Sequence, residues 1–231
     1  MFVRQFFDTH SSTYTYLIMD RQTQMAALID PVAEKTDFYL QTLRELNLDL
    51  QLVLDTHTHA DHISANGRLR ERSQCQTVMG AQSLATCVDR HVRDGDRIAL
   101  GSVAIEAIYT PGHTDDSYTY CIQSERQAYL FTGDTLLIRG SGRTDFQNGD
   151  AFEQYHSLFE KLLRFPEETL VYPGHDYQGR SVSTIGEEIR HNPRLQVADA
   201  EAYAEIMNNL NLPNPKMMDV AVPANQACGR V

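Results

Sequence analysis

The seven-residue run THTHADH, Thr56–His62, constrains this chain more than any other segment. It contains three histidines and an aspartate, and the alternation of its first two histidines places both imidazole rings on one side of an extended segment. Imidazole and carboxylate groups together suit zinc, iron or manganese better than calcium or copper(I). The run therefore predicts a transition-metal site directly after the apolar strand Leu50–Leu54.

Three later segments repeat the same local form, in which an apolar strand leads through a short glycine turn to a histidine or an aspartate. They are Val103–Tyr109 before His113, Ala128–Thr132 before Asp134, and Leu170–Tyr172 before His175. Rigid strands followed by short turns hold metal ligands precisely, so we expect these residues to converge at one rim of a β-sandwich. The remaining histidines we interpret as ordinary core or surface residues: His10, His91, His156 and His191.

Charge and composition restrict the classes of function. The 231 residues have a formal net charge of −11, and nucleic acids and anionic membrane surfaces both require basic patches. No apolar run approaches the roughly eighteen residues of a membrane span, and Arg4, Gln5 and Asp8 interrupt the N-terminus too early for a secretory signal. We therefore expect a cytoplasmic protein that binds neither nucleic acid nor membrane.

The cysteines show no CxxC spacing and are widely separated: Cys75, Cys87, Cys121 and Cys228. In a chain without an export signal, this pattern is typical of free thiols in a reducing compartment. We therefore expect no disulfide.

Apolar patterning predicts many strands and few helices. Strands are expected at Phe2–Phe7, Tyr14–Met19, Met25–Ile29, Leu50–Leu54, Gln76–Met79, Arg97–Leu100, Val103–Tyr109, Tyr118–Ile122, Ala128–Thr132 and Thr169–Tyr172. Helices are expected at Glu34–Asn47, Ser64–Arg72, Phe152–Leu163, Ser183–His191 and Asp199–Asn209. This pattern favours two sheets packed face to face with helices outside. We expect one domain over residues 1–231, in which 180–231 form a short helical and extended C-terminal segment, extended after Leu212 where Pro213, Pro215 and Pro223 occur.

With these features in place, the chain resembles the metallo-β-lactamase superfamily. The resemblance rests on THTHADH at 56–62, PGH at 111–113, TGD at 132–134 and PGH at 173–175, in the superfamily's order. It implies an α/β fold, the αβ/βα sandwich of two mixed β-sheets, with a metal site at one edge. It does not define the reaction, because hydrolases, nucleases, flavoprotein reductases and dioxygenases share this fold.

Further motifs resemble one branch of that superfamily, the persulfide dioxygenases, also called sulfur dioxygenases. They are LLIRGSGRTDFQ at 136–147, DY at 176–177, ST at 183–184, NPRL at 192–195, NLNLP at 209–213, VPAN at 222–225 and CG at 228–229. This resemblance implies one Fe(II) per chain, held by His57, His113 and Asp134 as the catalytic ligands. The other ligand-type residues would then support the site without binding iron: His59, Asp61, His62 and His175.

The substrate that the resemblance implies is glutathione persulfide, whose terminal sulfur is oxidised with O₂ and water to sulfite and glutathione. The residues placed around it are Arg143, Tyr177, Arg194, Met207 and Cys228. Each arginine can bind a glutathione carboxylate through two parallel hydrogen bonds. Other interpretations remain open, namely an ion pair with Asp145 for Arg143, a helix core position for Met207, and a modifiable thiol for Cys228.

Two alternative functions compete with this hypothesis. A hydrolase of glutathione thioesters similar to glyoxalase II would use a dinuclear site, and all seven ligand-type residues are present. Against it, RGSGRTDFQ suits the dioxygenases, and only about fifty residues follow Arg180, too few for the longer helical domain of those hydrolases. A non-catalytic protein that carries a persulfide through Cys228 is the other alternative. A homodimer stays open, because no interface pattern is evident.

Overall fold

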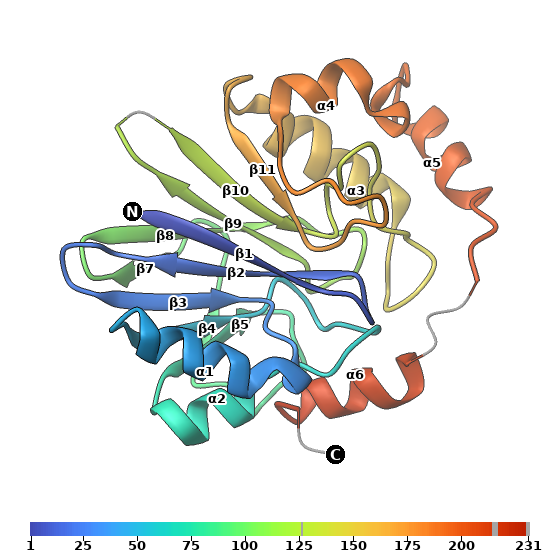
Figure 1. Ribbon diagram of the computed structural model, residues 1–231. Coiled ribbons are helices and arrows are strands. Elements are labelled where there is room, and N and C mark those ends of the chain that lie inside the picture. The colour runs from blue at the N-terminus through green and yellow to red at the C-terminus, as the bar shows by residue number, and fades with distance from the viewer. Residues whose placement is uncertain (126, 214–216, 230–231) are drawn as a thin grey trace.

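The computed structural model describes residues 1–125, 127–213 and 217–229. Two six-stranded sheets pack face to face, and helices cover the outer side of each (Figure 1). The first sheet has the strand order β1-β2-β3-β4-β5-β6, and the second has the order β12-β11-β10-β9-β8-β7. Both sheets mix parallel and antiparallel pairs. The predicted αβ/βα sandwich of two mixed sheets is confirmed.

The strands agree closely with the segments expected from the apolar pattern. They are β1 (Phe2–Asp8), β2 (Thr13–Met19), β3 (Met25–Ile29), β4 (Asp49–Leu54), β5 (Gln76–Gly80), β6 (Arg90–Val92), β7 (Arg97–Leu100), β8 (Val103–Tyr109), β9 (Tyr118–Gln123), β10 (Ala128–Gly133), β11 (Leu170–Pro173) and β12 (Ser183–Thr184). Two strands were not predicted. The strand β6 has only three residues, which include Arg90 and His91 and show no apolar alternation, and pairing with β5 stabilises it. The strand β12 occupies Ser183–Thr184, where the start of a helix was expected, because these two residues pair with β11 and the helix begins only at Ile185.

The α-helices are α1 (Thr36–Glu45), α2 (Asn66–Ser73), α3 (Ala151–His156), α4 (Ile185–His191), α5 (Ala200–Asn208) and α6 (Met218–Gln226). Helical turns at Ser157–Lys161 and Leu162–Arg164 continue α3, so the helical segment expected at Phe152–Leu163 is confirmed. The extended tail predicted after Leu212 is wrong at α6, where Pro223 lies inside a helix. Residues 214–216, which include Pro215 of that prediction, lie outside the described residues.

Three apolar layers hold the sandwich together. Between the sheets, the fully buried side chains include Tyr16, Leu54, Tyr120 and Phe131. A second cluster joins the outer face of the first sheet to α1 and α2, and a third joins the outer face of the second sheet to α3 and α5. Strands such as β2 and β9 are thus buried on both faces, which explains why they read as continuous apolar runs, whereas the edge strand β7 alternates buried and exposed residues.

Strand direction explains why the ligand-type residues meet. The strands β8 and β10 both run antiparallel to β9, and β11 runs parallel to β10. Their carboxyl ends therefore lie at the same edge of the second sheet. The loop after β4 reaches this edge from the first sheet, where the Tyr118 amide donates to the Thr56 carbonyl at 2.7 Å and the Tyr120 hydroxyl to the Asp55 carbonyl at 3.0 Å.

The expectation of four free thiols is wrong for two cysteines. Cys87 and Cys228 form a disulfide across a sequence separation of 141 residues, with Cα atoms 6.0 Å apart. The cause is tertiary, since the end of α6 packs against the loop after β5, a contact that cysteine spacing does not encode. Cys75 and Cys121 are free and buried.

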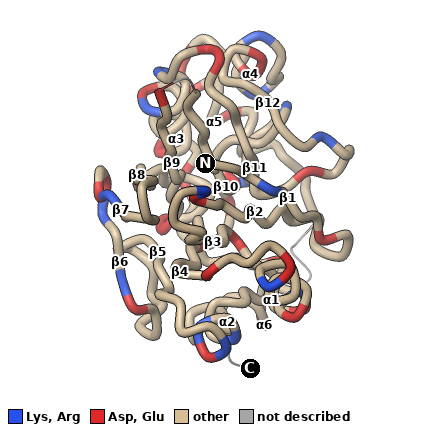
Figure 2. Tube along the Cα trace, turned by 60° about the vertical axis from the view of Figure 1, so that its left-hand side comes forward, with Lys and Arg blue, Asp and Glu red and all other residues tan. Residues whose placement is uncertain are grey.

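Charged residues of both signs are interspersed along the chain (Figure 2). Across the part of the chain that the structure describes, no helix is both long and apolar enough to span a membrane.

Candidate metal centre and pocket

Three of the predicted ligands come together at the edge of the sandwich. Single ligand atoms of His57, His113 and Asp134 all lie within 4.8 Å of one another. The Nε2 atom of His113 is 3.6 Å from Oδ2 of Asp134, and the rings of His57 and His113 have centroids 4.9 Å apart. These residues come from the ends of β4, β8 and β10, as the strand directions require.

The hydrogen bonds of His57 leave one ring nitrogen available for a metal. Thr56 donates its hydroxyl proton to Asp30 Oδ2 at 2.9 Å. The hydroxyl oxygen can then only accept from His57 Nδ1, which is 3.0 Å away. Burial lowers the pKa of His57, and His59 and His113 lower it further. The ring is therefore neutral, and its Nε2 carries a free lone pair.

His113 is oriented in the same way by a backbone carbonyl. Its Nδ1 lies 2.7 Å from the carbonyl oxygen of Arg143, which can only accept a hydrogen bond. Nδ1 is therefore protonated, and Nε2 presents a lone pair toward Asp134. A hydrogen bond from the other nitrogen is the usual means of orienting a metal-binding histidine.

Asp134 and Asp61 lie on the two sides of His175. Nδ1 of His175 is 2.7 Å from Oδ1 of Asp134, and Nε2 is 2.9 Å from Oδ2 of Asp61. Burial alone would lower the pKa of His175, but these two carboxylates raise it well above its ordinary value. Burial also opposes ionisation of Asp134, yet His175 holds the pKa of Asp134 well below its ordinary range. In the absence of a metal, both ring nitrogens of His175 thus contact carboxylates.

A second group of possible ligands, His59, Asp61 and His62, lies beside the first. Nδ1 of His59 and Nε2 of His62 are buried and have no hydrogen-bond partner among the described residues. Burial lowers the pKa of His62. Burial acts in the same direction on His59, but Asp30 outweighs it and raises the pKa of His59 to about 9. His59 is therefore protonated at neutral pH when no metal competes for the ring.

Three buried aspartates that sequence reasoning missed hold the ligand loop. Asp30 accepts from the Thr56 amide at 2.7 Å, and Asp116 accepts from the Thr58 amide at 3.1 Å. Asp55 accepts from Asn66 at 2.6 Å, and burial raises the pKa of Asp55 to about 7. Asp30 and Asp55 each directly follow a buried strand, and this position is the signal that could have revealed them.

Two glycines are required by close packing around the ligands. Gly112 has a φ of +134°, and a Cβ atom there would lie 2.3 Å from the Cα of Gln154. At Gly174, a Cβ atom would lie 2.6 Å from Oδ1 of Asp134. Glycine is therefore needed at position 112 because of the positive φ, and at position 174 because there is no space for a Cβ atom.

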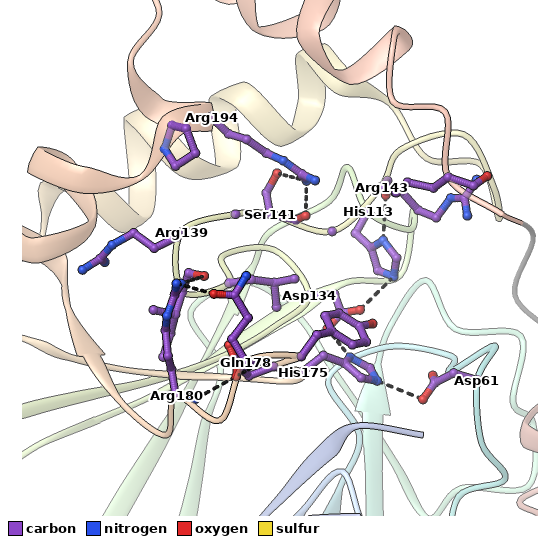
Figure 3. A pocket seen from close by; sticks show the side chains of 18 of the residues that line it. Asp61, His113, Asp134, Arg139, Ser141, Arg143, His175, Gln178, Arg180 and Arg194 are labelled. Carbon is purple, nitrogen blue, oxygen red and sulfur yellow. Dashed lines mark hydrogen bonds and ion pairs between the residues drawn. The ribbon is translucent and has the colours of Figure 1, made fainter. Parts of the chain in front are cut away.

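A pocket of about 750 Å³ opens beside the three ligands. Its lining includes His57, His113, Asp134 and His175 and extends to four arginines: Arg139, Arg143, Arg180 and Arg194 (Figure 3). Leu137, Ile138, Leu212 and Pro213 provide apolar walls. This size suits a small organic ligand, and the arginines favour an anionic one.

The structure places three of the five predicted substrate-binding residues in the lining of this pocket: Arg143, Tyr177 and Arg194. Tyr177 is 75% exposed at the pocket, with its ring parallel to that of His175. Arg194 donates to the carbonyl and hydroxyl oxygens of Ser141. Arg143 binds Asp145 through two hydrogen bonds of 2.6 and 2.7 Å, which is the ion pair considered as an alternative.

The other two predicted substrate-binding residues do not line the pocket. Met207 is a buried core residue of α5, and its sulfur lies 3.7 Å from the hydroxyl of Ser141, which does line the pocket. Cys228 is buried, and its sulfur is bonded to Cys87. The roles suggested for a free Cys228 thiol therefore do not apply to the protein in this disulfide-bonded state.

The chain is similar to several known proteins. Residues 9–175 match the metallo-β-lactamase superfamily. Over 228 residues the chain is 47% identical to the persulfide dioxygenase ETHE1, mitochondrial, of Homo sapiens, covering 98% of this chain and 88% of the human one. The crystal structure of ETHE1 from Myxococcus xanthus is 54% identical, with a TM-score of 0.95 over 99% of this chain and 100% of that one.

A more distant similarity concerns the hydrolase alternative. The chain is 31% identical over 237 residues to a probable hydroxyacylglutathione hydrolase of Schizosaccharomyces pombe, covering 89% of this chain and 90% of the relative.

Proposed function

Because the chain belongs to the persulfide dioxygenase family of the metallo-β-lactamase superfamily, we propose that it oxidises glutathione persulfide with O₂ and water. The products are sulfite and glutathione, so both atoms of O₂ are incorporated at the terminal sulfur. The observation that carries this proposal is the cluster of His57, His113 and Asp134 at the end of a pocket lined by arginines.

The proposed cofactor is one Fe(II) per chain, and the ligand chemistry fits it. The Nε2 atoms of His57 and His113 and the Oδ2 atom of Asp134 form a two-histidine, one-carboxylate set, which is typical of non-haem iron oxygenases. Iron bound there would supply the redox chemistry with O₂, which no protein side chain provides.

The remaining residues orient the ligands and the substrate. Thr56 and the Arg143 carbonyl hold the two ligand imidazoles in the required tautomer. His175 binds Asp134 and keeps its Oδ1 atom engaged, which leaves Oδ2 directed toward His113. The pocket arginines would neutralise the carboxylates of glutathione, and the apolar wall at Leu212 would cover the peptide.

The glyoxalase II-like alternative rests on a specific observation, the second ligand group at His59, Asp61 and His62. The degree of sequence similarity argues against it, because the chain is 47% identical to a persulfide dioxygenase over 98% of its length and 31% identical to a probable hydroxyacylglutathione hydrolase over 89% of its length. We therefore favour the mononuclear dioxygenase.

Metal analysis combined with O₂ uptake on glutathione persulfide tests the proposal. The expected result is about one iron per chain and sulfite production that accompanies O₂ consumption. His113→Ala and Asp134→Ala should each lose iron and O₂ uptake together, whereas His191→Ala, an exposed control on α4, should retain both. Two metals per chain with hydrolysis of a glutathione thioester and no O₂ uptake would favour the alternative.

A cytoplasmic location and a homodimer stay predictions. The mammalian relatives carry the word mitochondrial in their names, so fractionation of cells that express the full chain is the direct test of location. Light scattering or sedimentation tests the dimer.

A further inference from the structure

The four arginines that line the pocket differ in whether a carboxylate already neutralises them. Arg139 pairs with Glu187 and with the fully buried Glu188. Arg143 pairs with Asp145 through both Nε and a terminal nitrogen. Arg180 and Arg194 have no carboxylate partner among the residues that the structure describes.

Within the described ranges of the chain, the hydrogen-bond partners of the Arg180 guanidinium are neutral oxygens. The guanidinium donates to the carbonyl of Ile138 at 3.3 Å and to the side-chain oxygen of Gln178 at 2.5 Å. A guanidinium has five N–H donors, so these two contacts leave donors for a ligand. Figure 3 shows Arg180 beside Gln178 on a wall of the pocket, separated from the His113–Asp134 pair.

The backbone around Arg180 is held in place, so the side chain starts from a defined point. The amides of Gln178 and Arg180 both donate to Oδ2 of Asp176 at 2.7 Å. The carbonyl of Arg180 accepts from the hydroxyl of Tyr14 at 3.0 Å. Arg180 itself is half-buried, so a ligand carboxylate bound there would be partly shielded from water and its ion pair strengthened.

We propose that Arg180 is a specificity residue that binds a substrate carboxylate remote from the reacting sulfur, with Arg194 as the second unneutralised guanidinium of the pocket. A guanidinium without a counter-ion can bind a carboxylate through two parallel hydrogen bonds. Arg143, by contrast, must release Asp145 before it can do so. This inference rests on the proposed function, and it narrows the substrate to persulfides that carry a carboxylate at a distance from the sulfur.

The electrostatic setting favours this assignment. The chain has a net charge of −11, and Asp61, Asp134 and Asp176 also line the pocket. An anionic substrate would be repelled unless positive groups that are not already paired lie along its path. Arg180 and Arg194 are the arginines of the lining that meet this condition in the described chain.

Kinetics on two substrates tests the role of Arg180. Arg180→Gln should raise KM for glutathione persulfide about tenfold or more, the effect of losing one charge-assisted contact, and should change kcat by less than about twofold. Arg180→Lys should raise KM less than Arg180→Gln does, since lysine retains the positive charge but lacks the paired N–H donors of a guanidinium. Arg190→Gln, an exposed arginine of α4 that pairs with Glu167, is the matched control and should behave as wild type.

The persulfide of glutathione diethyl ester, which has no free carboxylate, separates charge recognition from a structural effect. Wild type and Arg180→Gln should show the same KM on the ester within about twofold, with equal iron content. An unchanged KM of Arg180→Gln on glutathione persulfide would overturn the inference, and so would an equal rise on both substrates.

A binding experiment tests the role of Arg180 even if the proposed dioxygenase activity is not found. If the wild type consumes no O₂ with glutathione persulfide, binding of glutathione itself is measured by calorimetry on the same variants. Weaker binding to Arg180→Gln than to Arg190→Gln would then support the carboxylate site independently of the reaction, and equal binding would overturn it.

Discussion

Replacing Asn225 by alanine is expected to weaken the metal site from outside the pocket. Asn225 lies near the end of α6 and is 3% exposed. Its Oδ1 atom accepts from the Ser64 amide at 2.8 Å, and its Nδ2 atom donates to the carbonyls of His59 and His62 at 2.9 Å each. One side chain from the C-terminal helix thus holds three backbone groups of the ligand loop.

The size of the effect follows from these three hydrogen bonds. Each contributes about 1 kcal/mol net to stability, so Asn225→Ala should lower the free energy of unfolding by about 3 kcal/mol. For a chain of this length, each kcal/mol corresponds to roughly 2–4 °C in Tm, which gives a decrease of roughly 6–12 °C. Iron affinity should fall as well, because His57 begins the loop that Asn225 holds.

Thermal unfolding and metal analysis at matched protein concentration measure both effects. Asn208→Ala is the control, since Asn208 is an exposed asparagine of α5 and its replacement removes the same groups without touching the loop. Asn225→Asp gives a second test: it retains the acceptor for Ser64 but places a carboxylate oxygen against the His59 and His62 carbonyls, so it should be no more stable than the alanine variant. A Tm for Asn225→Ala equal to that of Asn208→Ala would refute the reasoning.

Two further predictions concern α6 and the turn before His113. Reduction of the Cys87–Cys228 disulfide should lower the free energy of unfolding by about 2–5 kcal/mol, because the bond closes a long loop. Denaturant titration with and without reductant measures this difference. As a control, the free energy of unfolding of Cys87→Ser should be the same with and without reductant. A wild type whose stability does not respond to reductant would contradict the disulfide. Gly112→Ala should lose at least about 2 kcal/mol of stability together with iron, since a Cβ there meets the Gln154 backbone at positive φ. Gly95→Ala, at φ +80° with nothing within 4 Å of the added Cβ, isolates the conformational strain and should cost less; equal losses in the two variants would show that the contact with Gln154 is unimportant.

The local pattern of residues was sufficient to predict much of the fold. Apolar strands that end in His or Asp predicted β4, β8, β10 and β11 and the edge at which they meet. These elements are visible in the sequence because each depends on neighbours within a few residues. The strands β6 and β12 and the helix α6 were missed, since contacts distant in the sequence stabilise them: pairing with β5, pairing with β11 and packing against the ligand loop, respectively.

The sequence by itself was sufficient to predict a metal site and, through its motifs, the residues that could hold the metal. Only the tertiary structure decided which nitrogen each histidine offers, because the partners that set the tautomers, such as the Arg143 carbonyl for His113, are distant along the chain. The tertiary structure alone likewise decided that Cys87 pairs with Cys228 and which arginines of the pocket are already paired with carboxylates. The sequence does not distinguish Arg139, Arg143 and Arg180. In the folded protein, carboxylates pair with Arg139 and Arg143, so that the guanidinium of Arg180 is the one of the three that can bind a ligand carboxylate.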